Sequence, residues 1–215
     1  FSQTGAARYI SHLDLMRTFQ RAFLRAGIPV RHTEGFNPHA YVSILLPLSV
    51  GFSSTCEILE FGLLGEIDPG EVPERLRDAL PAGVEVHRCR DALRPARQLA
   101  FVEYIVTLEY ENGVPTGTVH ALQELFRRDS LVVAKRSKKA KSGQVQVDLI
   151  PLIRELSFEG RRDTVTIDAV LRAQNPGLNP ELLTAALREH YPGMAPDFVS
   201  YHRKAVLDEE LRIFE

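Results

Sequence analysis

The chain has 215 residues, and 44% of them are hydrophobic, which is typical of a folded protein and excludes a disordered tail. Its net charge of −2 excludes a uniformly basic protein that coats polyanions. No apolar run approaches the roughly 18 residues of a membrane helix, and two cysteines are too few for a disulfide framework or a zinc site, so we expect a cytoplasmic protein that does not enter a membrane.

The first part of the chain alternates between strand-like and helix-like patterns. A strand end and a turn over 1–10 precede a helix expected from Asp14 to Ala26. Ser11 and Asp14 form a variant capping box at its start, and Gly27 stands where a left-handed residue commonly ends a helix. The pattern continues with a strand at 41–48, a hairpin connection at 51–54, a strand at 55–64, a helix at 68–80 and a strand at 84–89.

The same order of elements follows a polar connector at 94–99. We expect a strand at 101–109, a helix at 118–128, two hairpin arms at 131–135 and 144–150, strands at 156–158 and 164–171, a helix at 180–190 and a strand at 198–206. The repeated order predicts an α+β fold of two ferredoxin-like (βαββαβ) units with antiparallel sheets. We place the first unit at 1–93, the linker at 94–99 and the second unit at 100–215.

Three segments near the start carry a resemblance to a known family: Phe1–Gly5, Tyr9–Arg17 with its Ser-His-Leu-Asp motif, and Gly35–His39 with the sequence Gly-Phe-Asn-Pro-His. They resemble the radical-SAM-linked family of bacterial proteins, which carries a domain of unknown function. The resemblance continues through Pro47–Gly51, Glu57, Lys138–Lys139 and Val147–Asp148. Members of that family occur beside, or fused to, radical-SAM proteins with a cobalamin-binding-like region. The resemblance therefore implies a radical-SAM protein as a partner and implies no particular reaction.

The residues agree with a partner role. Radical-SAM chemistry needs three closely spaced cysteine thiolates to hold an iron–sulfur cluster. The two cysteines here, Cys56 and Cys89, lie 33 positions apart, so this chain cannot hold that cluster by itself. Its glycines also lack the spacing of a phosphate-binding loop. We expect no cofactor, no metal and, on balance, no catalytic activity of its own.

One segment is strongly basic. Four of the five lysines, together with Arg136, fall within seven residues: Lys135, Arg136, Lys138, Lys139 and Lys141. Flexible lysines at the tip of a hairpin suit contact with phosphates without sequence recognition. The alternative is a solvated loop with no ligand. We predict RNA binding here, with Arg17 and Arg21 of the first helix extending the surface, although these arginines could instead pair with nearby acids.

The other candidate site is the polar set near the first helix. His12, Asp14, His32 and His39 could supply a general acid and base if the helix start and the following loop converge. Alternatively, His12 and Asp14 cap the helix, while Asn37 and His39 fix the loop. A metal site from the histidines has no motif spacing behind it. We assign a surface for a partner or ligand to five residues: His12, Phe36, Asn37, His39 and Tyr41.

These observations predict a non-catalytic, RNA-binding companion of a radical-SAM enzyme that helps present an rRNA or tRNA substrate. A tandem ferredoxin-like protein with histidines near its first helix is also similar to the CRISPR repeat-processing endoribonucleases, which cleave RNA without metal. The alternative function is therefore such a ribonuclease, with His12 and His39 as catalytic residues. This chain lacks the glycine-rich motif of that group near its C-terminus. A pure protein-interaction module is the third possibility.

Overall fold

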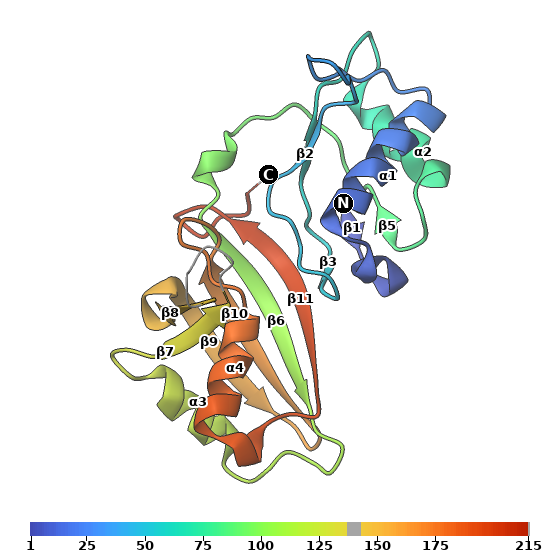
Figure 1. Cartoon of the computed structure of the whole chain (residues 1–215). Coiled ribbons are helices and arrows are strands. Elements are labelled where there is room, and N and C mark those ends of the chain that lie inside the picture. The colour runs from blue at the N-terminus through green and yellow to red at the C-terminus, as the bar shows by residue number, and fades with distance from the viewer. Residues whose placement is uncertain (137–142, 215) are drawn as a thin grey trace. The chain divides into compact units, whose positions relative to one another are not determined.

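The computed structural model describes residues 1–136 and 143–214 of the chain, which form two compact units, Phe1–Gln98 and Leu99–Phe214. Both units combine helices with antiparallel strands, which confirms the predicted α+β class (Figure 1). In the described residues, no helix combines the length and the apolar character needed to cross a membrane.

Helix α1 (His12–Arg25) organises the first unit. Its predicted apolar face is confirmed, because Leu15, Phe19, Ala22 and Phe23 are buried. The chain leaves the helix through Gly27, whose φ of +63° lies in the left-handed region. The N–H groups of Gly27 and Ile28 donate to the carbonyls of Leu24 and Phe23, which is a Schellman motif. Local sequence thus sets both ends of this helix.

The strands of the first unit are short. They are β1 (Ser2–Gln3), β2 (Val42–Ile44), β3 (Ser53–Ser54), β4 (Leu59–Phe61) and β5 (Val84–Glu85). Strand β1 pairs antiparallel with both β3 and β5, and β2 pairs antiparallel with β4. The expected hairpin connection at 51–54 is therefore wrong for Ser53 and Ser54, which form a strand because Gln3 of β1 pairs with Ser54.

The predicted helix at 68–80 is only partly α-helical. The segment consists of a 3-10 turn at Pro69–Glu71, helix α2 (Val72–Leu76) and a second 3-10 turn at Arg77–Ala79. Pro69 and Pro73 lack the backbone N–H that an α-helical hydrogen bond requires, which shortens the regular part. A further 3-10 turn, Gly5–Tyr9, occupies half of the segment 1–10, where the sequence indicated a strand end and a turn.

The second unit has long strands. Its sheet follows the order β11–β6–β10–β9, and all three pairs are antiparallel. The strands are β6 (Phe101–Glu109), β9 (Ile153–Gly160), β10 (Thr164–Arg172) and β11 (Phe198–Leu207). Helices α3 (Thr118–Phe126) and α4 (Glu181–His190) lie on the same face of this sheet (Figure 1). Alternate residues of β6 and β10 are buried beneath them: Tyr104, Val106, Leu108, Val165, Ile167 and Ala169.

A hairpin is inserted between α3 and β9. Its arms, β7 (Val132–Arg136) and β8 (Gln144–Asp148), pair antiparallel over five residues. Buried Leu131, Val133 and Leu149 hold its base within the unit. Without the hairpin, the elements β6, α3, β9, β10, α4 and β11 follow the βαββαβ order of a ferredoxin-like unit.

Candidate functional site

The start of α1 is held by its own side chains. Ser11 Oγ accepts a hydrogen bond from the Asp14 N–H at 3.2 Å and donates to Asp14 Oδ2 at 2.7 Å. Arg17 Nη1 lies 3.1 Å from Asp14 Oδ1. The hydrogen bond from Ser11, followed by that from Arg17, lowers the pKa of the Asp14 carboxyl below its ordinary value. Ser11 and Asp14 are thus fully engaged in capping the helix.

His12 lies half-buried at the same helix start. Its Nδ1 atom is buried and has no hydrogen-bond partner among the described residues, and the same holds for Gln3 Oε1 and Arg8 Nε. The Arg8 guanidinium stacks over the Tyr9 ring at 4.8 Å and donates to the Tyr9 hydroxyl. In the described residues, Nδ1 of His12 therefore has no carboxylate that would orient it as a catalytic base.

The loop that contains Gly35–His39 is an ordered turn. Thr33 N–H donates to the His39 carbonyl at 2.8 Å, and Tyr41 N–H donates to the Arg31 carbonyl at 2.8 Å. His39 Nδ1 lies 3.1 Å from the Asn37 carbonyl, so in the tautomer that protonates this nitrogen it donates a hydrogen bond there. These contacts fix the loop backbone and leave its outermost side chain free.

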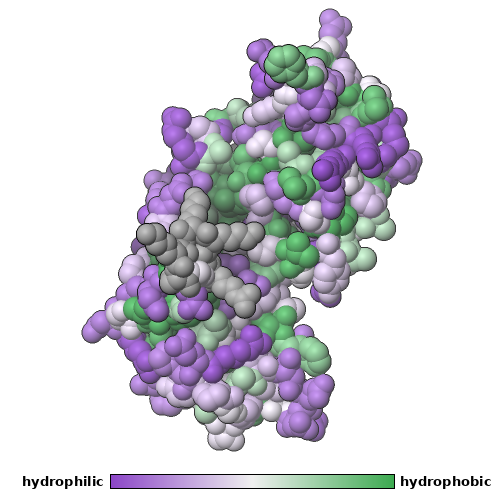
Figure 2. All heavy atoms as spheres, viewed as in Figure 1, coloured by the Kyte–Doolittle hydropathy of each residue, from purple (hydrophilic) through white to green (hydrophobic). Residues whose placement is uncertain are grey.

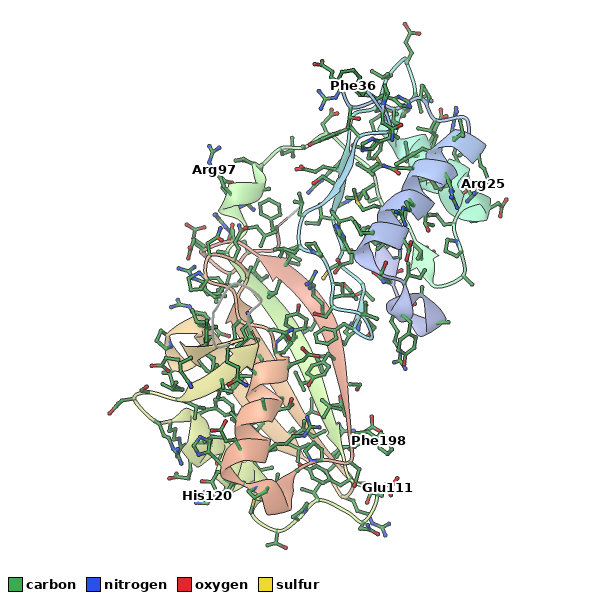
Figure 3. All side chains as sticks on the ribbon, in the orientation of Figure 1. Arg25, Phe36, Arg97, Glu111, His120 and Phe198 are labelled. Atoms are coloured by element: carbon green, nitrogen blue, oxygen red, sulfur yellow. The ribbon has the colours of Figure 1, made fainter. Side chains whose placement is uncertain are left out.

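That outermost side chain is Phe36. It is fully exposed, at 112% of its reference area. Figure 3 shows Phe36 pointing away from the body of its unit, and in Figure 2 a hydrophobic side chain stands at this place among hydrophilic ones. Nearby in the sequence, the Arg31 guanidinium stacks on the Tyr41 ring at 4.8 Å. An exposed ring on a fixed loop is available for contact with a partner.

The helix start and this loop lie at different places along α1. His12 is the first residue of the helix, whereas Gln20, two turns later, donates to the Ala40 carbonyl of the loop at 3.0 Å. Figure 3 shows Phe36 toward the end of the unit that holds Arg25, the last residue of α1. No group of three His, Cys, Asp or Glu side chains in the described chain is arranged to hold a metal. The structure therefore does not bring His12, His32 and His39 together.

The arginine row of α1 is partly occupied by internal contacts. Arg17 pairs with Asp14, and Arg25 donates to the Ala79 carbonyl. Arg21 is exposed. Since two of the three cations already have partners, this row offers less free positive charge than its spacing predicts.

The arms of the basic hairpin are described, but its tip is not. Lys135 is exposed on β7, and Arg136 is described only in its backbone as the last residue of that strand. Lys138, Lys139 and Lys141 lie outside the described residues. At the base, Asp148 Oδ1 accepts hydrogen bonds from the N–H groups of Leu131 and Ile150. The bond from Leu131 is the main reason that the pKa of Asp148 is lowered, and this carboxylate ties the two arms together.

A cavity between α3 and β9 was not predicted. Its volume is about 430 Å³, and its walls come from both elements and from the turn that follows the hairpin. The residues that line it include Gln123, Phe126, Arg127, Ile150, Ile153 and Phe158. Phe126 and Phe158 occupy apolar positions of a helical and a strand pattern, which in the sequence indicate only core packing.

Comparison with known families gives a direct result. A family model described as "Uncharacterized protein conserved in bacteria (DUF2344)" matches residues 1–180. The chain belongs to this family. The match includes the Ser-His-Leu-Asp and Gly-Phe-Asn-Pro-His motifs of the DUF2344 protein and most of its second unit. It does not bear on the radical-SAM partner that the sequence resemblance implies.

Comparisons with other proteins add only fold information. No curated protein matches the sequence. A solved structure entitled "Crystal Structure of a Cbf5-Nop10-Gar1 Complex" has a similar fold, with a TM-score of 0.51 and 9% sequence identity. The alignment covers 95% of the DUF2344 chain and 47% of the solved chain, so this chain spans about half the length of that protein. At this identity the likeness concerns the fold alone.

Proposed function

We propose that this DUF2344 protein binds RNA through its basic hairpin and presents an rRNA or tRNA to a radical-SAM enzyme without catalysing a reaction itself. The observation that carries the proposal is the hairpin: two paired arms with a buried base lead directly into a segment with five positive charges. Like charges this close repel one another, and a polyanion relieves that repulsion. Lysines at such a tip suit phosphate contacts.

The first unit supports contact with a protein partner. Phe36 is fully exposed on a loop whose backbone is fixed by internal hydrogen bonds, so its burial requires little rearrangement of the chain. Aromatic residues are enriched in protein interfaces. We therefore place the radical-SAM partner at the surface that includes Phe36 and His39.

The RNA part of the proposal is tested by salt-dependent binding. The triple variant Lys138→Ala/Lys139→Ala/Lys141→Ala should bind RNA more weakly, and the slope of log K against log salt should fall by about 0.7 to 0.9 for each lost phosphate contact. The control Arg77→Ala/Arg161→Ala/Arg162→Ala removes three exposed charges elsewhere and should keep the parent slope. Equal binding by parent and hairpin variant at every salt concentration would overturn the proposal.

The protein part is tested by co-purification with the radical-SAM protein. Phe36→Ala should reduce the recovered complex strongly, whereas the control Leu24→Ala, which removes another exposed apolar side chain from the same unit, should not. Equal recovery with both variants would exclude Phe36 from the interface. The purified chain should also leave RNA intact in EDTA. Cleavage that disappears in both His12→Ala and His39→Ala would establish the ribonuclease instead.

A further inference from the structure

The cavity between α3 and β9 lies next to the base of the basic hairpin. Ile150 and Ile153, which help to line it, follow β8 within a few residues. Each five-residue arm of the hairpin spans roughly 15 Å, at about 3.3 Å per residue. A flexible strand of a few nucleotides is long enough to extend from the cavity along the described arms of the hairpin.

The walls of the cavity combine aromatic rings with a cation. Phe126 and Phe158 are stacked on each other, with ring centroids 6.1 Å apart and an interplanar angle of 26°, and both are half-buried. Among the described residues that line the cavity, Arg127 is the charged one, and its side chain is 72% exposed. Its Nη1 atom lies 3.8 Å from Oε1 of Glu124, which is too long for a hydrogen bond, so most of its guanidinium donors are available to a ligand.

A polar group completes the site. The half-buried side-chain amide of Gln123 makes no hydrogen bond to the described residues, so it can donate to and accept from a ligand. The volume of about 430 Å³ falls within the range of pockets that hold small ligands. The cavity thus offers a flat apolar wall, an amide and a cation, and none of its lining residues in the described part of the chain is acidic.

We propose that this cavity binds one unpaired nucleotide of the RNA, with its base against Phe158 and Phe126 and its phosphate facing Arg127. The inference rests on the proposed RNA-binding function and makes it more specific. A base inside a duplex cannot reach such a wall, whereas unpaired bases stack on aromatic side chains and on Arg. Charge complementarity favours a nucleotide, because the cation lies beside the aromatic wall. The RNA at this site is therefore single-stranded.

The experiment compares two RNAs by fluorescence anisotropy. One is a labelled 15-nucleotide single strand that contains 2-aminopurine, and the other is the same strand annealed to its complement. Phe158→Leu keeps an apolar side chain and removes the ring, so it should weaken single-strand binding about tenfold. Arg127→Ala should weaken it severalfold. Arg128→Ala, which removes the neighbouring exposed charge outside the cavity, should have no effect.

The outcomes separate the two proposals. In the parent, 2-aminopurine fluorescence should be quenched on binding, and Phe158→Leu should abolish this quenching in folded protein while duplex affinity stays unchanged. If Phe158→Leu and Arg127→Ala bind the single strand like the parent while the hairpin variant loses affinity, the cavity proposal fails and the proposed function stands. Loss of protein-partner binding alone in these variants would show that a protein side chain fills the cavity. If the hairpin variant keeps full affinity, the proposed function fails.

Discussion

The two units are similar in length but are stabilised by different kinds of interaction. In the second unit, four strands of 8 to 10 residues form long antiparallel ladders beneath two helices, with one register shift in the β10–β9 pair and one in the β11–β6 pair. In the first unit, no strand exceeds three residues. Its structure depends on side chains around α1 and on single backbone contacts such as that between Thr4 N–H and the Gly83 carbonyl. Backbone ladders stabilise the one unit, and side-chain packing stabilises the other.

The difference has a functional meaning. A chain segment outside a ladder is free to take the course that a recognition surface requires, and binding residues are concentrated on such loops. The first unit accordingly carries the loop with Phe36 and the polar start of α1. In the second unit, the candidate surfaces stand at the margin of the sheet: an inserted hairpin, and a cavity at its edge strand β9.

The largest expected effect comes from the core of the first unit. Phe23 is fully buried, and its ring centroid lies 4.6 Å from that of Phe61. Phe23→Ala should cost about 3–5 kcal/mol of folding free energy. Hydrogen exchange should then show lost protection in 1–98 and retained protection in 99–214. The matched variant Leu183→Ala should lose protection in 99–214 and keep it in 1–98. If either variant loses protection in both units at once, the two units fold as one.

A smaller loss of stability is expected when either of two glycines with similar backbone conformations is replaced with Ala, and the loss should differ between them. Gly83 has φ of +87° and Gly113 has φ of +84°. Replacing either with Ala should cost about 1–2 kcal/mol for the left-handed conformation. At Gly83 the added Cβ would also overlap the Thr4 carbonyl oxygen, whereas at Gly113 the nearest atom is 3.5 Å away. Gly83→Ala should therefore cost roughly 1–3 kcal/mol more, measured by urea unfolding. Equal costs would show that the turn relaxes freely.

The cap of α1 should contribute less. Ser11→Ala should cost about 0.5–2 kcal/mol, because the Asp14 N–H loses its acceptor. Ser11→Asn should restore most of this stability, since Asn caps helices as well as Ser. The residue that precedes helix α3 is Gly117, which has no side chain to cap the helix, so no equivalent substitution exists at that position of the second unit. A melt that does not distinguish the three proteins would show that packing alone fixes the start of α1.

The smallest effects distinguish two carboxylates by pH. The pKa of Asp14 is lower in the folded protein than its ordinary value. The stability that this carboxylate adds to the fold is therefore present at neutral pH and is lost as pH falls through the folded pKa. The folded pKa of Asp168 is raised, mainly by burial and also by Glu103, so stability is lost as pH rises through it. Asp14→Asn should be destabilising at pH 7 and neutral in acid. At pH 7, Asp168→Asn should be at least as stable as the parent. The midpoints of urea unfolding at pH 7 and in acid test both variants.

Sequence predicted best where the determinants are local. The capping pair Ser11–Asp14 and the helix stop at Gly27 are confirmed, because each depends on residues within one or two turns. The alternating segment 101–109 is confirmed as β6, and the two hairpin arms are found within one or two residues of their expected bounds. Period-2 alternation over nine residues leaves little ambiguity about a strand.

The predictions from sequence were wrong or missing where contacts between residues far apart in the chain determine the structure. Ser53 and Ser54 belong to a turn-like run, and they form a strand because residues distant in the sequence, among them Gln3, lie beside them. The cavity was missed for the same reason. Phe126 and Phe158 each occupy a position typical of core residues, and the gap between α3 and β9 that they line arises only when the helix packs against the edge strand. Neither local pattern contains information about that gap.

Both cysteines lie in the first unit, so thiol chemistry can be used to follow that unit separately. Cys56 and Cys89 both lie in the first unit, both are half-buried, and neither is in a disulfide. Burial raises the pKa of the Cys89 thiol, which keeps the reactive thiolate scarce while the unit is closed. The second unit has no cysteine in its sequence. The reaction of the unlabelled protein with a thiol reagent therefore reports on its first unit alone.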